Sequence, residues 1–485
     1  MQSITIDKKE ELLRHSSSYH YTLVASKKIK KMKEEKLTNT IKSITIDGLF
    51  EIFDYKIEYP TSDNVLIVTG PNGFGKTQVL NIIFNLFNRN FLYFNKLVFD
   101  EIVIVLSNNF SITIDKKSNL QSEIEFEPKD DHLVHEKNRE LKFIFRENEN
   151  EIETFNYSIN ISNNLIKQID HFLPVARVGP DQWVDHRTDQ IFNLEEVIRK
   201  YSNELPGEIS KNILKIEHDR TIQILNSIDV HLIKEQRLFK KIANRDKHYR
   251  SDRDRSIMIE TIQTYASELT KLISEKSQQS YIVTQALDST YPNRLVSEKN
   301  KISKEEYDER FARLTDKQKK LSANSLYDTK QNVLSYSEDD AKALMVYLND
   351  LEQKLSVFDG LLEKLELFTG ILNERRFTYK SISINREKGF FFKTSKGKPL
   401  ELTDLSSGEQ HEVVLLYELI FKTKPGILVL IDEPEISLHI TWQKEFLDDL
   451  LKIIDLQKFQ VLIATHSPSI INDRWDLVYN LEKKD

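Results

Sequence analysis

The chain of 485 residues contains no cysteine, few glycines and no long apolar run. Without cysteine it can form neither disulfides nor thiolate metal sites, and it needs no oxidising compartment. No apolar segment approaches the roughly 18 residues that a transmembrane helix requires, and the polar first residues do not resemble a secretory signal. We therefore expect a cytoplasmic protein with no membrane partner.

The net charge is −7, and this acidic balance argues against a protein coated all over with nucleic acid. Two local stretches are nevertheless basic, a lysine-rich segment at 27–36 and the segment from Arg237 to Arg255. A solvated helix face explains each of them, and so does contact with an anionic partner such as nucleic acid or an acidic viral protein. The sequence leaves both interpretations open.

Only 12 residues are glycine, yet three of them lie close together in one short segment. That segment follows the apolar run 65–69 and precedes the helical pattern 77–91. It fits the motif G-x-x-x-x-G-K-T in the strand–loop–helix context that this motif requires. Its residues are Gly70, Pro71, Asn72, Gly73, Phe74, Gly75, Lys76 and Thr77.

Such a loop curls its backbone N–H groups around phosphate oxygens, and the helix N-terminus adds partial positive charge. We expect Lys76 to reach the β- and γ-phosphates and the hydroxyl of Thr77 to complete a Mg2+ shell. Gln78, the next residue, completes the predicted binding segment. The sequence therefore predicts a binding site for ATP and Mg2+.

Apolar spacing divides the chain into four parts. Alternating segments predict short strands at 41–50, 51–59, 65–69, 97–106, 110–114, 122–127 and 141–146. From about 241 to 370 the spacing is helical, with a capping pair at Ser303 and Glu306 and a heptad series from Leu344 to Leu365. This pattern predicts a helical arm that leaves a compact head and returns to it, although core packing within one domain would also explain a single stripe. The predicted parts are a polar extension, the first half of the head, the helical insertion and the second half of the head: 1–40, 41–240, 241–370 and 371–485.

Two continuous apolar runs after the arm, 427–431 and 460–464, predict strands buried on both faces. The first run ends in Asp432 and Glu433, at the edge where an open α/β sheet places ligand chemistry. Asp432 is suited to hold Mg2+ through water, and Glu433 to accept a proton from the water that attacks the γ-phosphate. Taken alone, this acidic pair would also fit a surface turn.

Two further segments link the acidic pair to a nucleotide site. Ser406, Ser407, Gly408 and Glu409 precede a helical pattern and predict a second anion-binding helix N-terminus. His466 follows the second apolar run, so we expect its imidazole beside the same sheet edge.

These four segments, in this order, resemble those of the ABC-type ATPases, in the SMC-like branch rather than among the transporters. The run LSSGE at 405–409 is similar to the signature of that branch, with Ser407 in place of a glycine. The run ATHSP at 464–468 is similar to its switch-histidine segment, and residues 437–439 occupy the position of its D-loop. Residues 230–238 resemble its Q-loop strand.

The resemblance implies an α/β head with a mixed sheet and an antiparallel β lobe, interrupted by a coiled-coil-like helical insertion. It assigns catalytic roles to Glu433 and His466, and it implies that Gln236 touches Mg2+ and the attacking water. It also implies that the signature of one copy closes on the γ-phosphate held by another copy. We therefore expect a homodimer or a higher oligomer.

The runs LSSGEQHEVVLLYELIF and THSPSIINDRWDLV resemble the short-armed ATPases of bacterial antiphage defence: PARIS first, then Septu, and the ATPase domains of OLD and Gabija. This resemblance implies a sensor or regulatory subunit that controls a separate effector nuclease of TOPRIM or HNH type. The trigger would be a phage protein or a nucleic acid. Because the chain ends 19 residues after His466, we expect it to carry no TOPRIM domain.

Three other functions fit parts of the pattern. A DNA-repair or chromosome-maintenance ATPase acting with a nuclease is the main alternative, although the short arm and the lack of a cysteine zinc hook disfavour it. The LSSGE run and the large insertion disfavour a transporter motor. A nucleotide-dependent scaffold with very slow turnover remains open, because the sequence does not set a rate.

Overall fold

The computed structural model describes residues 39–60, 64–116, 141–156, 172–179, 182–185, 191–192, 197, 201, 219–234, 238–242, 257–328, 335–436 and 438–482. These residues form two compact units. Unit 1 comprises the described residues of 1–62, 81–230 and 426–428, and unit 2 those of 63–80, 231–425 and 429–485. The lysine-rich segment at 27–36 and the strand predicted at 122–127 lie outside the described residues.

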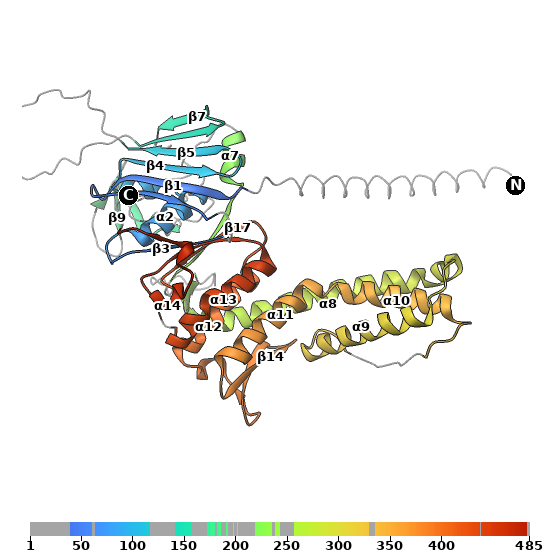
Figure 1. The fold of residues 1–485 in the computed structure, drawn as a ribbon. Helices are drawn as coiled ribbons and strands as arrows, with labels where there is room; N and C mark the ends of the chain where they lie inside the picture. Colours follow the sequence, from blue (N-terminus) through green and yellow to red (C-terminus); the bar gives the residue numbers. More distant parts are fainter. Residues whose placement is uncertain are drawn as a thin grey trace, which may run out of the picture. The chain divides into compact units, whose positions relative to one another are not determined.

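Unit 1 is built on a six-stranded sheet, blue to teal in Figure 1. The strand order is β2-β1-β4-β5-β6-β7, and all neighbours run antiparallel. Buried residues alternate along β4, as expected for a sheet with one face on a core. This sheet is the predicted antiparallel lobe. Its strands are β1 (Ile41–Leu49), β2 (Phe53–Glu58), β4 (Glu101–Leu106), β5 (Phe110–Asp115), β6 (Lys142–Glu147) and β7 (Asn150–Asn156).

The strand expected at 97–106 begins only at Glu101, so its first residues were predicted wrongly. They follow the end of a short helix, where the buried ammonium of Lys116 donates hydrogen bonds of 2.7–3.1 Å to three backbone carbonyls. Carbonyls at a helix end lack partners within the helix, so a buried cation stabilises this ending. The helix is α3 (Leu92–Lys96), and the carbonyls belong to Phe94, Asn95 and Leu97.

The other elements of unit 1 are small. A three-stranded sheet has the order β10-β9-β8 and is antiparallel. Its strands are β8 (Val175–Gly179), β9 (Gln182–Asp185) and β10 (Ile191–Phe192). Helix α7 (Asp219–Leu225) packs against β7.

Unit 2 contains most residues of a five-stranded sheet with the order β11-β17-β18-β3-β19. β3 runs parallel to both of its neighbours, β18 and β19. All residues of β18 and all but the last of β17 are buried, which confirms that both apolar runs are central strands. The strands are β3 (Val65–Thr69), β11 (Asp229–Ile233), β17 (Ile427–Asp432), β18 (Gln460–Ala464) and β19 (Val478–Asn480).

Helices connect these strands near the candidate site. α2 (Lys76–Phe87) follows β3, and α13 (Ile440–Gln457) connects β17 to β18. α12 (Ser407–Tyr417) continues into a π-helical turn (Glu418–Lys422), and α14 (Pro468–Ile471) follows β18. None of the helices among the described residues is both long enough and apolar enough to cross a membrane.

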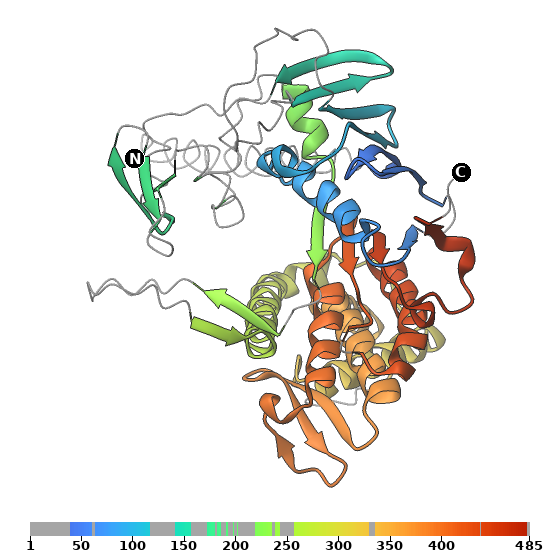
Figure 2. The same cartoon turned by 90° about the vertical axis from the view of Figure 1, so that its left-hand side faces the viewer.

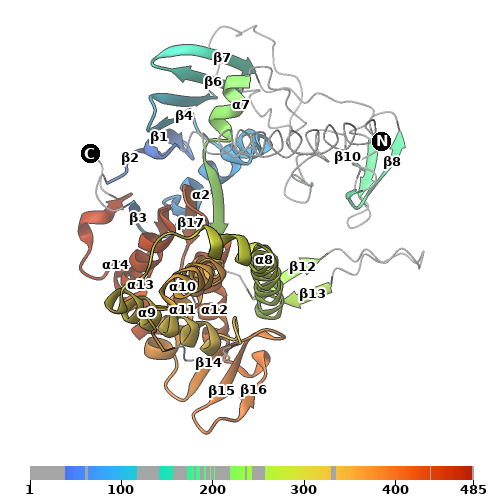
Figure 3. The ribbon, with the colours of Figure 1, turned by 90° about the vertical axis from the view of Figure 1, so that its right-hand side faces the viewer.

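The helical insertion forms an arm, and Figure 3 looks along it. α10 packs against both α8 and α9, so three helices lie side by side (Figure 1). Arg294 of α8 bonds to Asp350 of α10, and Arg310 of α9 bonds to Glu352 at 2.9 Å. The arm helices are α8 (Thr261–Ser297), α9 (Lys304–Ala323), α10 (Ala341–Ser356) and α11 (Asp359–Ile371).

One predicted detail of the arm is confirmed and another is wrong. Ser303 caps α9 as predicted, since its hydroxyl accepts the N–H of Glu306 at 3.2 Å. The heptad series, however, does not form one continuous helix, because α10 ends at Ser356 and α11 begins at Asp359. The N–H of Phe358 bonds to the carbonyl of Leu355, three residues back, which tightens the turn and breaks the helix there.

The chain returns from the arm through a π-helical turn (Leu372–Arg376) into an antiparallel sheet with the order β14-β15-β16, orange in Figure 2. β15 packs on α8 so closely that a side chain at Gly389 would meet the carbonyl oxygen of Ala266. The strands of this sheet are β14 (Lys380–Asn385), β15 (Gly389–Thr394) and β16 (Pro399–Leu400). A separate hairpin of β12 (Phe239–Ile242) and β13 (Ile257–Glu260) precedes α8.

Candidate nucleotide-binding site

The glycine-rich segment forms a loop between β3 and α2, all within unit 2 up to Leu80. Gly70, Gly73 and Gly75 have φ angles of +152°, +90° and +86°. Residues other than glycine rarely adopt these backbone angles, so the glycines are required for the loop to curl. α2 begins at Lys76, and its N-terminal N–H groups therefore lie at the loop.

Lys76, the first residue of α2, has a side chain that is 5% exposed. Its Nζ donates hydrogen bonds to the carbonyls of Gly70 at 2.9 Å and Pro71 at 3.3 Å. It also lies 3.7 Å from Oε1 of Glu433, at the end of a strand more than 350 residues later. The fold thus brings the loop cation and the acidic strand end into contact.

Thr77 and Asp432 form a second link between the loop and β17. The Thr77 hydroxyl donates a hydrogen bond of 3.0 Å to Oδ1 of Asp432. A hydroxyl and a carboxylate oxygen at this separation are hard oxygen ligands of the type that Mg2+ prefers. The residues present therefore fit the predicted magnesium site. Gln78 follows in the first turn of α2 and is half-buried.

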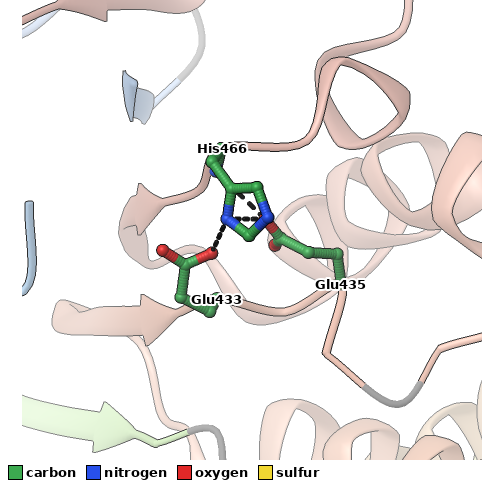
Figure 4. Close-up of side chains that lie close together, drawn as sticks. All are labelled: Glu433, Glu435 and His466. Carbon is green, nitrogen blue, oxygen red and sulfur yellow. Dashed lines mark hydrogen bonds and ion pairs between the residues drawn. The ribbon is translucent and has the colours of Figure 1, made fainter. Parts of the chain in front are cut away.

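Glu433 has an unusual backbone for a glutamate. Its φ angle is +45°, in the left-handed region, and its N–H bonds to the carbonyl of Ala464 at 2.9 Å. Strained backbone of this kind persists only where surrounding contacts hold it, and it is frequent at functional sites. The side chain of Glu433 points toward His466 (Figure 4).

His466 lies between two carboxylates, those of Glu433 and Glu435 (Figure 4). Its Nδ1 is 2.6 Å from Oε2 of Glu433 and 3.2 Å from Oε1 of Glu435. The imidazole is about half exposed, whereas both carboxylates are largely buried. One oxygen of each carboxylate and one ring nitrogen lie within 4.8 Å of one another.

Burial raises the pKa of Glu433 to about 7. The nearby carboxyl of Glu435 adds to this rise, and the hydrogen bond from His466 opposes it. A carboxylate whose pKa lies near neutral pH is matched to proton transfer, because a base works best when its pKa is close to the working pH. The environment of Glu433 therefore suits the role of general base.

The segment Ser406–Glu409 forms the N-terminus of α12 through a reciprocal capping box. The Ser406 hydroxyl donates to Oε2 of Glu409 at 2.9 Å and accepts the Glu409 N–H at 3.4 Å. Lys380 of β14 also binds the Glu409 carboxylate, at 2.8 and 3.0 Å. Burial opposes ionisation of Glu409, but the bonds from Lys380 and Ser406 outweigh it and hold its pKa below the ordinary value.

The other residues of the signature are accessible. Ser406 and Ser407 are exposed, and Gly408 is half-buried. Their hydrogen bonds belong to the helix start itself, and this segment does not take part in the Lys76–Glu433–His466 cluster. Within one copy, the fold therefore unites the loop, the acidic strand end and the histidine, while the signature stands apart from them in its contacts.

Two predicted residues lie outside the described part of the chain: Gln236 of the Q-loop and Ser437 of the D-loop. His439, also from the D-loop segment, caps α13 with its Nδ1. The sequence reasoning missed Glu435, which contacts His466, and Lys380, which binds the carboxylate of the signature residue Glu409. Glu435 had one available signal, its position two residues after Glu433 in the run Asp-Glu-Pro-Glu.

A strand, a glycine-rich loop and a helix that face an acidic strand end are typical of P-loop nucleotide-binding proteins. Residues 40–471 match the family model described as AAA ATPase domain (AAA_15), and the chain therefore belongs to this family of nucleotide-binding ATPase domains. No curated protein matches the chain in sequence.

Among solved structures, the chain is similar to the Smc head domain of Pyrococcus furiosus with an extended coiled coil, bound to the C-terminal domain of ScpA. The identity is 12%, the match covers 89% of this chain and 91% of that chain, and the TM-score is 0.34. An SMC head domain from Thermotoga maritima gives 10% identity, coverage of 91% and 94%, and a TM-score of 0.30.

Proposed function

We propose that this protein is an ATPase that binds ATP with Mg2+ and hydrolyses it at sites shared between two copies. The observation that carries the proposal is the convergence of five side chains from remote parts of the sequence at one edge of the unit 2 sheet. They are Lys76, Thr77, Asp432, Glu433 and His466.

Each of these residues has a role in the proposed reaction. Lys76 and the loop N–H groups bind the β- and γ-phosphates. Thr77 and Asp432 hold Mg2+, which neutralises phosphate charge when bound. Glu433 accepts a proton from the attacking water, and His466 orients this carboxylate through Nδ1.

The proposal includes a homodimer or larger oligomer, because the signature is expected to complete the site of another copy. Two features support this arrangement. Ser406 and Ser407 are exposed at a helix N-terminus, where partial positive charge favours an anion. The hydrogen bonds of the Ser406 side chain are made to Glu409 rather than to the loop of its own copy.

A mixture of two inactive variants tests the shared site. Lys76→Ala removes the phosphate cation, and Ser406→Arg blocks the signature surface, so each variant alone should hydrolyse no ATP. A mixed dimer places both lesions in one site and leaves the other site intact. With random exchange in a two-fold dimer, equal mixing should restore about a quarter of the wild-type rate.

Native mass spectrometry of the same sample must first establish that mixed dimers form. The control is each variant alone at the same total protein concentration, and it should remain inactive. If proven mixed dimers hydrolyse no ATP at any ratio, the shared-site proposal is rejected, provided that wild-type rates show no cooperativity between sites.

We further propose that ATP turnover makes this protein a sensor or regulatory subunit that controls a separate effector nuclease in antiphage defence. The signature and histidine segments support this role through their resemblance to the PARIS ATPase subunit. By the same resemblance, the nuclease chemistry is assigned to a separate protein of TOPRIM or HNH type.

The defence role predicts the result of a phage infection assay. Cells that carry this gene with its genomic neighbour should reduce plaque formation, and Lys76→Ala should abolish the protection. The trigger would be a phage protein or a nucleic acid, which escape mutants of the phage would identify. A neighbouring phosphoesterase nuclease, with no protection from phage, would instead favour a DNA-repair ATPase.

A further inference from the structure

Glu435 is a buried acid to which the proposed reaction gives no role. It follows Glu433 and Pro434 in the turn after β17, and its side chain is 6% exposed. Burying a carboxylate costs free energy unless hydrogen-bond donors surround it. The donors that approach Glu435 come from one short segment, the residues that follow β18.

One oxygen of Glu435 accepts three hydrogen bonds from three consecutive residues. The Thr465 hydroxyl donates to Oε1 at 2.6 Å, the His466 N–H at 3.0 Å and the Ser467 N–H at 3.1 Å. Hydrogen bonds to an ionised acceptor are stronger than those between neutral groups. A single carboxylate oxygen therefore fixes the backbone from which the imidazole of His466 projects.

Other contacts join the same two segments. The Glu433 N–H bonds to the carbonyl of Ala464, and Gln443 of α13 donates to the Glu435 carbonyl at 3.3 Å. The Ser467 hydroxyl donates to the side-chain oxygen of Gln443 at 3.1 Å. The turn after β17 and the segment after β18 are thus held together from both ends, with Glu435 at the centre.

The position of the imidazole determines which ring nitrogen carries hydrogen. Nδ1 of His466 faces one oxygen of Glu433 and one of Glu435. When both carboxylates are ionised they can only accept, so Nδ1 then carries the hydrogen and Nε2 is the ring nitrogen left for other partners. Outer contacts of this kind are known to set the tautomer and orientation of metal-ligating histidines.

We propose that Glu435 is a positioning residue: it holds residues 465–467 and orients the imidazole of His466 so that Nδ1–H meets Glu433 and Nε2 is available to the nucleotide. This inference rests on the proposed function, in which Glu433 is the base. The oxygen of Glu435 that faces Nδ1 of His466 is the same oxygen that receives the three hydrogen bonds, which favours a positioning role.

Kinetics of two variants test the proposal in the full-length protein. Glu435→Ala removes the acceptor, so kcat should fall about 10- to 100-fold, by analogy with outer contacts of metal-ligating histidines. The KM for ATP should stay within about threefold, since Lys76 and the loop are intact. Glu435→Gln keeps an oxygen that can accept the backbone N–H groups, so it should restore part of the lost kcat.

Asp449→Asn is the matched control, because it neutralises another buried carboxylate of unit 2 outside the site, on α13. It should leave kcat unchanged even if it lowers the melting temperature. The proposal is overturned if the Glu435 and Asp449 variants lose the same amount of kcat for the same drop in melting temperature. Glu435 would then have only a structural role.

A spectroscopic measurement reports the orientation without hydrolysis. In protein labelled with ¹⁵N-histidine and studied without nucleotide, the His466 signals are assigned by their loss in His466→Ala. They should have the shifts of the Nδ1–H form in the wild type and move toward a mixture of tautomers in Glu435→Ala. If that variant does not fold, a smaller shift in the same direction is expected in Glu435→Gln, which keeps part of the acceptor.

The outcomes separate this inference from the proposed function. If Glu433→Gln hydrolyses ATP normally, the proposed function fails, whatever the His466 signals show. If Glu433→Gln is inactive while Glu435→Ala retains normal kcat, the positioning role is overturned and the proposed function stands. A loss of kcat with unchanged His466 signals also overturns it, because Glu435 would then act by another route.

Discussion

Lys76→Ala should remove measurable ATP binding. The Nζ of Lys76 is the buried cation of the loop and already holds two loop carbonyls, so it is positioned to take phosphate oxygens as its acceptors. Two hydrogen bonds from a charged donor contribute about 1.5–3 kcal/mol each. Their loss corresponds to roughly a 10²- to 10⁴-fold weaker affinity. Calorimetric titration with ATP and Mg2+ measures the change.

The control for this variant is Lys452→Ala, which removes an exposed lysine of α13 at a distance from the loop in sequence. It should bind ATP with wild-type affinity. An affinity of Lys76→Ala within about twofold of the wild type would reject the phosphate-loop assignment, since no other contact in the proposal replaces the lost charge.

Glu433→Gln should bind ATP normally but hydrolyse it about 100-fold more slowly or worse, as expected when general-base help is lost. Glutamine keeps the shape of the side chain and removes its ability to take a proton. The experiment measures phosphate release at saturating ATP together with affinity by calorimetry. A loss of turnover with unchanged affinity separates the base from the binding residues.

Glu445→Gln, an equivalent change on α13, serves as the control and should leave phosphate release unchanged. Near-normal phosphate release by Glu433→Gln would mean that another group activates the water. In that case the left-handed backbone and the raised pKa of Glu433 would belong to the architecture of the turn rather than to catalysis.

Much of the fold was predictable because it depends on local patterns. The phosphate loop has fixed spacing and is flanked by the strand and helix that it requires, and β17 and β18 are continuous apolar runs. The start of α9 at Ser303 followed from capping chemistry between residues three apart. In each case the physical cause lies within a few residues of its effect.

The errors have the opposite origin. The late start of β4 depends on Lys116, which reaches back about twenty residues to the end of α3. The break between α10 and α11 lies at residues 357–358, and the heptad spacing outweighed the turn signal of Asp359 and Gly360 that directly follows it. Both features arise from tertiary contacts or local hydrogen bonding that hydrophobic spacing does not encode.

The candidate site likewise contains residues that the sequence predicts and one that it does not. Lys76, Thr77, Asp432 and Glu433 were recognisable from motif and strand position, and the fold brings them together. Glu435 was missed because its role depends on donors thirty residues later, in the segment 465–467. A glutamate in a turn is usually exposed, and only the packing of the two strand ends buries this one.

The capping box at Ser406 has a thermodynamic consequence for assembly. Its hydroxyl has a single hydrogen, and that hydrogen is already donated to Glu409. To donate to a phosphate held by a second copy, the hydroxyl must rotate and give up this bond, which costs about 1 kcal/mol. In the proposed dimer, each closed site would thereby be weakened roughly fivefold relative to one with a free hydroxyl, and this would help the two copies to separate once phosphate has left.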